Sequence, residues 1–337
     1  MKEGHPVAIG LIDWYSREKR DLPWRNSGNP YKVWLSEIIL QQTRVTQGLS
    51  YYYHFIETYP TVVDLASATE QQVLKSWEGL GYYSRARNLH KAAKQIVSQY
   101  DGHFPKTYDE LLSLKGIGPY TAAAIASICF GQPTPVVDGN VFRVVARLFK
   151  VKEDISAPKT RKLFTNLLLD IIDSKQPGDF NQAIMELGAL ICTPKNPACD
   201  KCCIQTSCDS FQDKSWSQFP IKGKKVKVKK RKFSYYLYQH EGYIAMKKRS
   251  PGDIWEGLWE FQLTENDSNS KENEVPFYKH ILTHQIIEAR FYKREVSDTA
   301  EFNDLLNRFQ LVAVSVDEVL TLPKSKLIVN YLNDHPF

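Results

Sequence analysis

The sequence lacks both a long apolar run and a recognisable leader segment. Its longest apolar stretch lies near residues 122–130 ("AAAIASICF"), far short of the roughly 18 apolar residues that suggest a membrane-spanning helix. Residues 1–10 contain no basic segment followed by an apolar one, so no signal peptide is predicted. We therefore expect a cytoplasmic protein with no membrane partner, and the short amino terminus favours a bacterial cytoplasm.

Outside one short segment the sequence has no excess of positive charge. Residues 222–232 ("KGKKVKVKKRK") contain eight of the 44 Lys and Arg residues and no acidic residue. The rest of the chain has 36 basic residues against 38 acidic ones, although the whole chain has a net charge of +6. Local basic character predicts one attachment surface for an anionic partner, with a solvated linker as the alternative.

Two differently patterned parts follow one another along the chain. Apolar residues recur at helical spacing from Tyr31 onward, which predicts a predominantly helical domain over residues 1–215. A basic linker is expected at 216–232. Residues 233–337 predict a β-rich domain, which has strands around a turn at Glu241–Gly242 and ends in a helix near Lys324–Leu332. The polar stretch 264–274 within this domain is expected to be a loop.

Most of the six cysteines are confined to one short region. Five lie between residues 192 and 208, and four of these have the spacing C-x6-C-x2-C-x5-C. Disulfides are rare in a reducing cytosol, so this spacing predicts a metal centre, either zinc or an iron–sulfur cluster. Cys203 is expected not to bind the metal, and Cys129 is expected to be a core residue. The predicted ligands are Cys192, Cys199, Cys202 and Cys208.

The stretch "LKGIGPYT" (114–121) contains a tight glycine turn between two predicted helices. Gly116 and Gly118 would allow a sharp turn and a close approach of the backbone to a partner. Free N–H groups at the start of the second helix would bind phosphate, so residues 111–130 predict a helix–hairpin–helix that grips a DNA backbone. A plain corner between two helices is the alternative. Asp138 follows in "VVDGN", where it has an ordinary role as a helix N-cap.

Several motifs together resemble a known family. "LKGIGPYT", "PTPVVDGN" and the four-cysteine spacing are similar to the iron–sulfur branch of the helix–hairpin–helix DNA glycosylase superfamily. Within that branch, "DLPWR" (21–25), "SEIILQQTRV" (36–45), "WEGLGYYSRARNLH" (77–90) and "NQAIMELGALIC" (181–192) resemble adenine glycosylases of the MutY type. The resemblance runs from about Arg20 to Cys208. It implies a 4Fe–4S cluster rather than zinc.

The resemblance also implies a mechanism. Glu37 lies in an otherwise apolar helix, where burial would raise its pKa and make it a proton donor near neutral pH; an exposed position on an amphipathic helix is the alternative. By resemblance, Glu37 protonates adenine at N7, and Asn140 orients the carboxylates by hydrogen bonds. Asp138 stabilises the positively charged sugar or bonds to it transiently. Related enzymes that also cut the strand carry a lysine where Tyr120 stands. The resemblance therefore implies a monofunctional glycosylase.

Further residues are assigned by the same resemblance to DNA and base recognition. Adenine must leave the duplex to be reached, and Gln42 and Tyr82 would fill the gap that it leaves. Gly116 and Gly118 would hold the backbone. The expected adenine pocket comprises Arg20, Leu22, Trp24, Arg25 and Gln182.

The carboxyl-terminal domain resembles a Nudix fold, most clearly at 252–262 ("GDIWEGLWEFQ"). No G-x5-E-x7-R-E-x2-E-E box is present, so pyrophosphate hydrolysis is not expected. In the family this domain recognises 8-oxoguanine opposite adenine through a loop that usually reads Phe-Ser-His. Here the loop reads Leu282, Thr283, His284, and Leu282 cannot stack as an aromatic ring does.

The expected function is therefore removal of adenine opposite 8-oxoguanine or guanine in double-stranded DNA, by a monomer that associates with the nucleoid through DNA. Three alternatives remain. One is an endonuclease III-like glycosylase and lyase, which Tyr120 and the extra domain disfavour. Another is a DNA-binding protein without catalysis, which the presence of both Glu37 and Asp138 disfavours. The third is a Nudix hydrolase fused to a DNA-binding domain.

Overall fold

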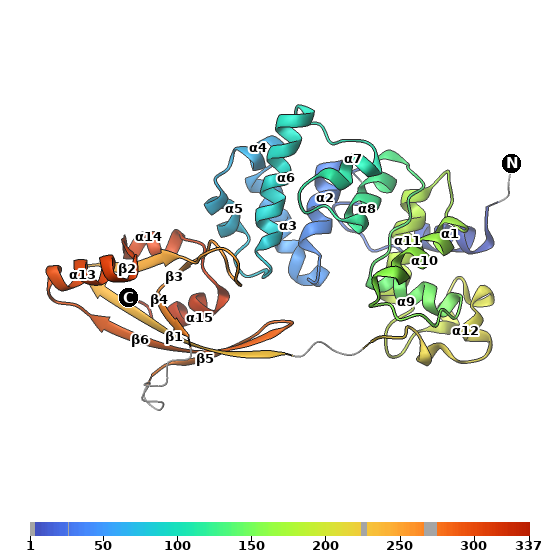
Figure 1. Cartoon of the computed structure of the whole chain (residues 1–337). Helices are drawn as coiled ribbons and strands as arrows, with labels where there is room; N and C mark the ends of the chain where they lie inside the picture. The colour runs from blue at the N-terminus through green and yellow to red at the C-terminus, as the bar shows by residue number, and fades with distance from the viewer. Residues whose placement is uncertain (1–3, 26, 224–227, 266–274) are drawn as a thin grey trace. The chain divides into compact units, whose positions relative to one another are not determined.

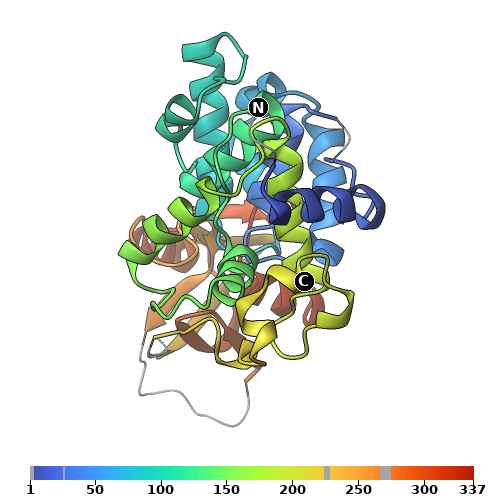
Figure 2. The ribbon, with the colours of Figure 1, turned by 90° about the vertical axis from the view of Figure 1, so that its right-hand side faces the viewer.

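A computed structural model describes residues 4–25, 27–223, 228–265 and 275–337. The chain divides into two compact units, one formed by residues 1–66 with 91–224 and the other by residues 67–90 with 225–337. The described chain up to residue 223 contains helices and no strand, which is visible in the blue-to-yellow parts of Figures 1 and 2. The predicted architecture, a mainly helical part followed by an α+β part, is confirmed.

The helices of the first unit begin at recognisable sequence signals. Asn29 caps α2 by accepting hydrogen bonds from two backbone N–H groups, and Pro30 occupies its first turn. Pro119 opens α8 in the same way, and Gly131 ends α8 in the left-handed conformation. The unit contains α1 (Pro6–Glu18), α2 (Pro30–Ile39), α3 (Val45–Thr58), α4 (Val62–Ser67), α7 (Tyr108–Ser113), α8 (Pro119–Phe130), α9 (Gly139–Leu148), α10 (Pro158–Leu169), α11 (Pro177–Leu190), η1 (Cys199–Lys201), η2 (Gln205–Ser207), α12 (Asp209–Gln212) and η3 (Trp216–Gln218).

The core of this unit forms around α8 and α11. Helix α8 contacts α2, α7 and α11, and α11 also contacts α1 and α9 (Figure 1). Small side chains allow this close packing, because residues 121–127 of α8 are all buried. The apolar run at 122–130 is thus a core helix. None of the helices in the described ranges is both long enough and apolar enough to cross a bilayer.

The second unit is built on a mixed sheet. Its strand order is β3-β2-β1-β6-β5, with β4 pairing β1 and β7 pairing β2. Strands β1 and β6 run parallel along most of their length, and β1 turns into β2 at Glu241–Gly242, where the sequence predicts a turn. The strands are β1 (Lys229–His240), β2 (Tyr243–Lys248), β3 (Trp259–Glu260), β4 (Gln262–Glu265), β5 (Phe277–Ile281), β6 (Gln285–Glu295) and β7 (Val312–Ser315); the helices are α5 (Glu70–Ser76), α13 (Thr299–Phe309), α14 (Val316–Thr321) and α15 (Lys326–Asp334).

Part of the expected boundary region is described by the structure. Strand β1 begins at Lys229, inside the segment predicted as a basic linker, while residues 224–227 of that segment lie outside the described residues. The predicted loop at 264–274 begins in β4, and its residues 266–274 also lie outside the described part.

Residues 67–90 group with the second unit, which the sequence does not predict. Tyr83 donates a hydrogen bond to the backbone oxygen of Lys324 over 3.0 Å, and the Lys324 amide donates to the Glu78 carboxylate over 2.9 Å. The segment continues into α6 (Ser84–Tyr100). It therefore contributes side chains to the surroundings of α14 and α15.

Candidate active site

The first unit contains a cleft of about 630 Å³ that brings together residues from four separate segments. The segments are the end of α2 with the residues after it, the glycine turn with the start of α8, the start of α9, and α10. The predicted residues Glu37, Tyr120 and Asp138 all line this cleft, as do Gln42 and both turn glycines. Its lining is Glu37, Leu40, Gln41, Gln42, Gly116, Gly118, Pro119, Tyr120, Thr121, Val137, Asp138, Gly139 and Arg161.

Glu37 reaches the cleft because the other face of α2 is committed to the core. Its immediate neighbours Leu35, Ser36, Ile38 and Ile39 are buried. Tyr120 donates a hydrogen bond of 2.5 Å from its hydroxyl to Glu37 Oε2. Burial raises the pKa of Glu37 to about 7, since the hydrogen bond from Tyr120 only partly opposes burial and the negative charge of Asp138 adds to it. A carboxylic acid with this pKa is half protonated at neutral pH.

Tyr120 is held in its protonated form beside this acid. Burial and the neighbouring charge of Glu37 raise the pKa of the phenol well above its usual value of 10. Its hydroxyl also lies 3.4 Å from Met185 Sδ. Tyr120 therefore acts here as a hydrogen-bond donor to the Glu37 carboxylate, with no tendency to ionise near neutral pH.

Asp138 caps α9, as its position ahead of a helix suggests. Its Oδ1 accepts a 2.7 Å hydrogen bond from the Val141 amide, and its Oδ2 accepts one of 3.0 Å from Asn140 Nδ2. Burial raises the pKa of Asp138, but these hydrogen bonds and the charge of Arg143 oppose the rise. The N-cap and a place in the cleft are thus compatible, because one carboxylate oxygen serves the helix end and the other faces Asn140.

Arg143 links this carboxylate to the cysteine-rich loop. Its Nη2 donates to Asn140 Oδ1 over 2.9 Å and to the backbone oxygen of Gly188 over 2.6 Å, while its Nε donates to the backbone oxygen of Cys192 over 2.6 Å. A side chain at Gly188 would collide with Asn140, because an added Cβ would lie 2.7 Å from Asn140 Cβ. The sequence analysis missed Arg143, since its partners lie up to 49 residues away.

The two turn glycines are not equivalent. Gly116 has a φ of +76°, which a residue with a side chain adopts only with strain. Gly118 has a φ of −92° and caps α8 without a side chain, and a Cβ added there would meet nothing within 4 Å. Gly116 is therefore required by the turn, whereas Gly118 leaves open space in front of the first N–H groups of α8.

The residues expected to form the adenine pocket do not line the cleft in this structure. Leu22 and Trp24 are buried, Trp24 packs edge-on against Tyr52, and Gln182 is almost fully buried. Arg20 and Arg25 instead bind Glu186, which the sequence analysis missed. The clamp comprises Arg20 Nε to Oε1 (2.8 Å), Arg20 Nη2 to Oε2 (2.6 Å), Arg25 Nη1 to Oε1 (3.0 Å) and Arg25 Nη2 to Oε2 (2.6 Å).

The pKa of Glu186 is shifted in the opposite direction to that of Glu37. Burial alone would raise the pKa of Glu186, but the hydrogen bonds from Arg20 and Arg25 outweigh it and lower the pKa to about 2. The carboxylate side chain is only 1% exposed and the Arg25 side chain 9%. Glu186 is therefore a fixed negative charge that joins α11 to the segment after α1.

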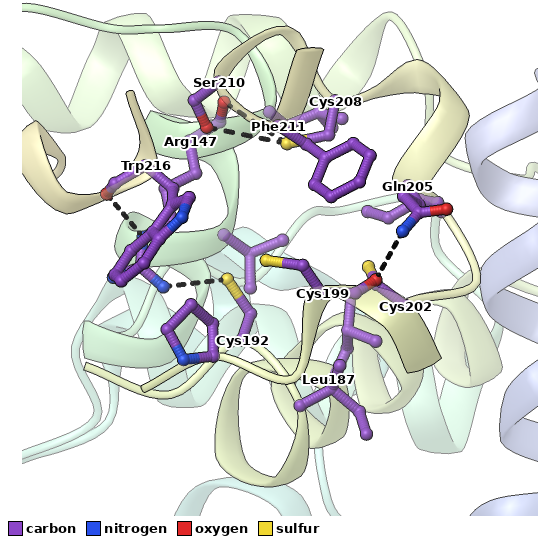
Figure 3. Close-up of a pocket in the computed structure, with 15 residues that line it drawn as sticks. Arg147, Leu187, Cys192, Cys199, Cys202, Gln205, Cys208, Ser210, Phe211 and Trp216 are labelled. Carbon is purple, nitrogen blue, oxygen red and sulfur yellow. Dashed lines mark hydrogen bonds between the residues drawn. The ribbon is translucent and has the colours of Figure 1, made fainter. Parts of the chain in front are cut away.

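All four predicted cysteine ligands line one cavity (Figure 3). Cys203 does not line it, and Cys129 lies in α8. The Arg147 guanidinium donates to Cys192 Sγ over 3.3 Å and to the backbone oxygen of Thr193 over 2.8 Å. Thiols are the only strong metal donors among the lining side chains, which fits a thiophilic group such as an iron–sulfur cluster. Across the described ranges, no three His, Cys, Asp or Glu side chains are arranged to hold a metal ion.

A second cavity, of about 440 Å³, lies within the second unit. Tyr82 and His284 line it, and the Tyr82 hydroxyl shares a hydrogen bond with the Thr283 hydroxyl. Trp255, which the sequence analysis did not single out, also lines it and packs edge-on against His280 with ring centroids 5.6 Å apart. The cavity therefore has aromatic walls in addition to Leu282.

Comparison with known proteins places these features in a family context. The HhH-GPD superfamily of base excision DNA repair proteins matches residues 35–168, and the NUDIX domain matches residues 234–334. The chain is 35% identical over 288 residues to the adenine DNA glycosylase of Buchnera aphidicola subsp. Baizongia pistaciae, and the match covers 81% of this chain and 82% of that relative. It is 37% identical over 320 residues to the adenine DNA glycosylase of Arabidopsis thaliana, covering 82% of this chain and 51% of the relative.

Among solved structures, a thermostable thymine-DNA glycosylase is similar, with a TM-score of 0.56 and 27% identity over 61% of this chain and 95% of that one. The chain spans between 39% and 51% of the length of its plant and mammalian relatives.

Proposed function

Because the chain belongs to the adenine DNA glycosylase family, we propose that it removes adenine mispaired with 8-oxoguanine or guanine in double-stranded DNA, as a monofunctional glycosylase. One observation carries the proposal. A partly protonated carboxylic acid, Glu37, and an aspartate with hydrogen-bonded oxygens, Asp138, line the same cleft. Two carboxyl groups in different environments are what hydrolysis of a glycosidic bond uses.

The proposed reaction begins with proton transfer from Glu37 to N7 of a flipped adenine. Protonation makes adenine a better leaving group, and the electrons of the C1′–N9 bond pass to the base as the bond breaks. The sugar becomes oxocarbenium-like, and the negative charge of Asp138 stabilises it until water adds at C1′ and gives its released proton to the Glu37 carboxylate. Asn140 holds Asp138 through its 3.0 Å hydrogen bond, and Arg143 holds Asn140.

The absence of strand cleavage is supported by the lining of the cleft. A lyase needs an amine that forms a Schiff base with the sugar. None of the described residues that line the cleft is a lysine. Tyr120 stands where related strand-cutting enzymes carry a lysine, and its hydroxyl donates a hydrogen bond to Glu37.

Recognition of DNA is assigned to both units. The open start of α8 after Gly116 and Gly118 would bind a phosphate of the backbone, and Gln42 lines the cleft from the loop after α2. In the second unit, Tyr82, Thr283 and His284 would contact the opposite strand and its 8-oxoguanine. The aromatic residues Trp255 and His280 offer stacking surface in a cavity whose recognition loop has Leu282 in place of an aromatic ring.

Cys192, Cys199, Cys202 and Cys208 would hold a 4Fe–4S cluster, or less favourably zinc. Bound there, the group would fix the loop 192–208 by linking its four thiolates. Arg147 already provides a hydrogen bond to one of these sulfurs, as is common around metal-bound thiolates. We further expect the protein to act as a monomer on chromosomal DNA in a bacterial cytoplasm.

The test uses a duplex with one adenine opposite 8-oxoguanine, labelled on the adenine strand, incubated with the whole protein and then divided. A break that appears only in the portion heated in alkali would support adenine removal without lyase activity. A break without alkali would contradict the monofunctional assignment and favour an endonuclease III-like enzyme. Intact strands in both portions, together with retained DNA binding, would contradict catalysis altogether and leave a DNA-binding protein.

A further inference from the structure

Arg161 has a position in the first unit that the family motifs do not explain. It lies in the first turns of α10, and its Nη1 donates a 2.7 Å hydrogen bond to the backbone oxygen of Val137. Val137 immediately precedes Asp138. The guanidinium also lies 5.5 Å from the ring centre of Phe142. One anchored contact thus ties α10 to the residue beside the candidate catalytic aspartate.

Arg161 stands where two hollows of the surface meet. It lines the cleft that contains Glu37 and Asp138, and it also lines a neighbouring cavity of about 200 Å³. The two share four lining residues: Pro119, Tyr120, Val137 and Arg161. The neighbouring cavity has no carboxylate among its described lining residues. A DNA strand that extends from the cleft into this neighbouring cavity would therefore contact the positive charge of Arg161 and no carboxylate.

The charge of Arg161 is largely uncommitted. A guanidinium has five N–H donors, and within the described ranges Arg161 makes one hydrogen bond and no ion pair. The oxygens of Asp138 are bonded instead to Val141 and Asn140. Anchoring on a carbonyl fixes the planar fork in place, which is how arginine prepares to bind a phosphate through two parallel hydrogen bonds.

We propose that Arg161 binds a backbone phosphate of the DNA strand whose nucleotide enters the cleft, and thereby positions the sugar of that nucleotide against Asp138. The inference deepens the proposed function and rests on it. It makes Arg161 a positioning residue, because it holds the strand while Glu37 and Asp138 act on the bond.

The salt dependence of binding tests this assignment. Affinity of the whole protein is measured from low to moderate salt for a duplex with a tetrahydrofuran abasic-site analogue opposite 8-oxoguanine. Each phosphate contact that is lost reduces the slope of log K against log salt by about 0.9. Arg161→Gln is expected to reduce the slope by about this amount. Lys162→Gln, an exposed residue of the same helix that lines neither hollow, is expected to keep the slope of the unaltered protein.

Arg161→Lys separates loss of charge from damage to the fold. This variant keeps the positive charge and is expected to keep the slope, although an ammonium group lacks the two parallel N–H groups of a guanidinium and should weaken affinity. Single-turnover excision at saturating enzyme should also slow in Arg161→Gln, because the sugar is no longer held against Asp138, whereas Lys162→Gln should keep the rate of the unaltered protein. An unchanged slope in Arg161→Gln, or an equal loss of slope in Arg161→Lys, would overturn the proposal. If the unaltered protein binds but excises nothing, the proposed function fails while the slopes still decide the role of Arg161.

Discussion

Glu37 and Glu186 are two glutamates of the same helical unit, and their pKa values differ by about five. The pKa of Glu37 is raised to about 7, and that of Glu186 is lowered to about 2. Burial raises the pKa in both cases. What differs is the partner: Glu37 accepts a hydrogen bond from a neutral phenol and lies near another carboxylate, whereas two guanidinium groups hold Glu186.

The comparison shows that burial alone does not make a catalytic acid. A buried carboxylate with two cations beside it stays ionised and holds structure together. A buried carboxylate without a cation bonded to it retains its proton to neutral pH, and can give that proton away. The fold keeps both kinds of site within one unit by directing Arg20 and Arg25 to Glu186.

The largest expected effect comes from removing the acid. Glu37→Gln keeps the shape of the side chain but cannot donate a proton to adenine. We expect the single-turnover rate of adenine excision to fall about 10²- to 10⁴-fold, the usual contribution of a general acid. Affinity for the mispaired duplex should remain within a few-fold of the unaltered protein, measured by titration of labelled DNA. Retained excision would remove Glu37 from the mechanism.

Replacing Glu186 should lower the free energy of unfolding. Glu186→Gln leaves two arginines without their partner, one of them 9% exposed, and breaking a buried ion pair from one side costs about 3–5 kcal/mol. Urea unfolding followed by circular dichroism measures the loss. Asp13→Asn is the matched control, because it breaks an exposed ion pair with Arg17 that is worth about 0–1 kcal/mol.

This difference in stability should also depend on pH. The pKa of Glu186 is about 2 in the folded chain against an ordinary value of 4.5, so its stabilisation is complete above about pH 4.5 and is lost as pH falls toward 2. The difference in the free energy of unfolding between the unaltered protein and Glu186→Gln should therefore become smaller as the pH falls. A difference that stays constant from pH 7 to pH 3 would contradict the assignment of Glu186 as a clamped carboxylate.

A smaller effect on the excision rate is expected from changing Arg143, which helps to position Asp138 through Asn140. Arg143→Gln removes the hydrogen bonds to Asn140 and to the backbone oxygens of Gly188 and Cys192. A slight displacement of Asp138 should slow single-turnover excision by about 10- to 100-fold. The pH midpoint set by Glu37 should not move, which separates a positioning role from a change in the acid. Arg17→Gln, an exposed substitution on α1, serves as the control.

The smallest predicted effect concerns Tyr120. Its hydrogen bond to Glu37 opposes the effect of burial and so lowers the pKa of that acid. Tyr120→Phe should raise the pKa of Glu37 further, so the alkaline limb of the excision profile should move to higher pH. At pH 7 the protonated fraction can at most double, so the rate there should change little. Tyr53→Phe, an exposed substitution on α3, serves as the control and should leave the profile unchanged. A shift of the alkaline limb to lower pH in Tyr120→Phe would contradict the expected rise in the pKa of Glu37.

The parts of the site that could be predicted are those whose residues follow local rules. Asp138 precedes a helix and caps it, the glycine turn contains a left-handed glycine at Gly116, and the four spaced cysteines line one cavity. Glu37 could be singled out because it is the one charged residue of the otherwise apolar stretch 33–40 ("VWLSEIIL"). In each case the signal is contained in a short stretch of chain.

The parts that could not be predicted depend on partners far apart in sequence. Arg20 lies 166 residues from Glu186, and Arg143 lies 49 residues from Cys192, so no local spacing indicates either contact. Arg161 carries no motif and is recognised only from the cavities it lines. Residues 67–90 read as an ordinary helical segment, and their grouping with the second unit comes from contacts such as Tyr83 with Lys324.

The most direct test of the difference between the two glutamates is the pH dependence of single-turnover adenine excision at saturating enzyme. If Glu37 is the acid, the rate should fall about tenfold per pH unit above a midpoint near its pKa of about 7. That limb should be absent from the residual activity of Glu37→Gln. A rate that is constant to pH 9, or a midpoint near the ordinary glutamate value of 4.5, would contradict the claim that burial without a bound cation makes Glu37 a proton donor.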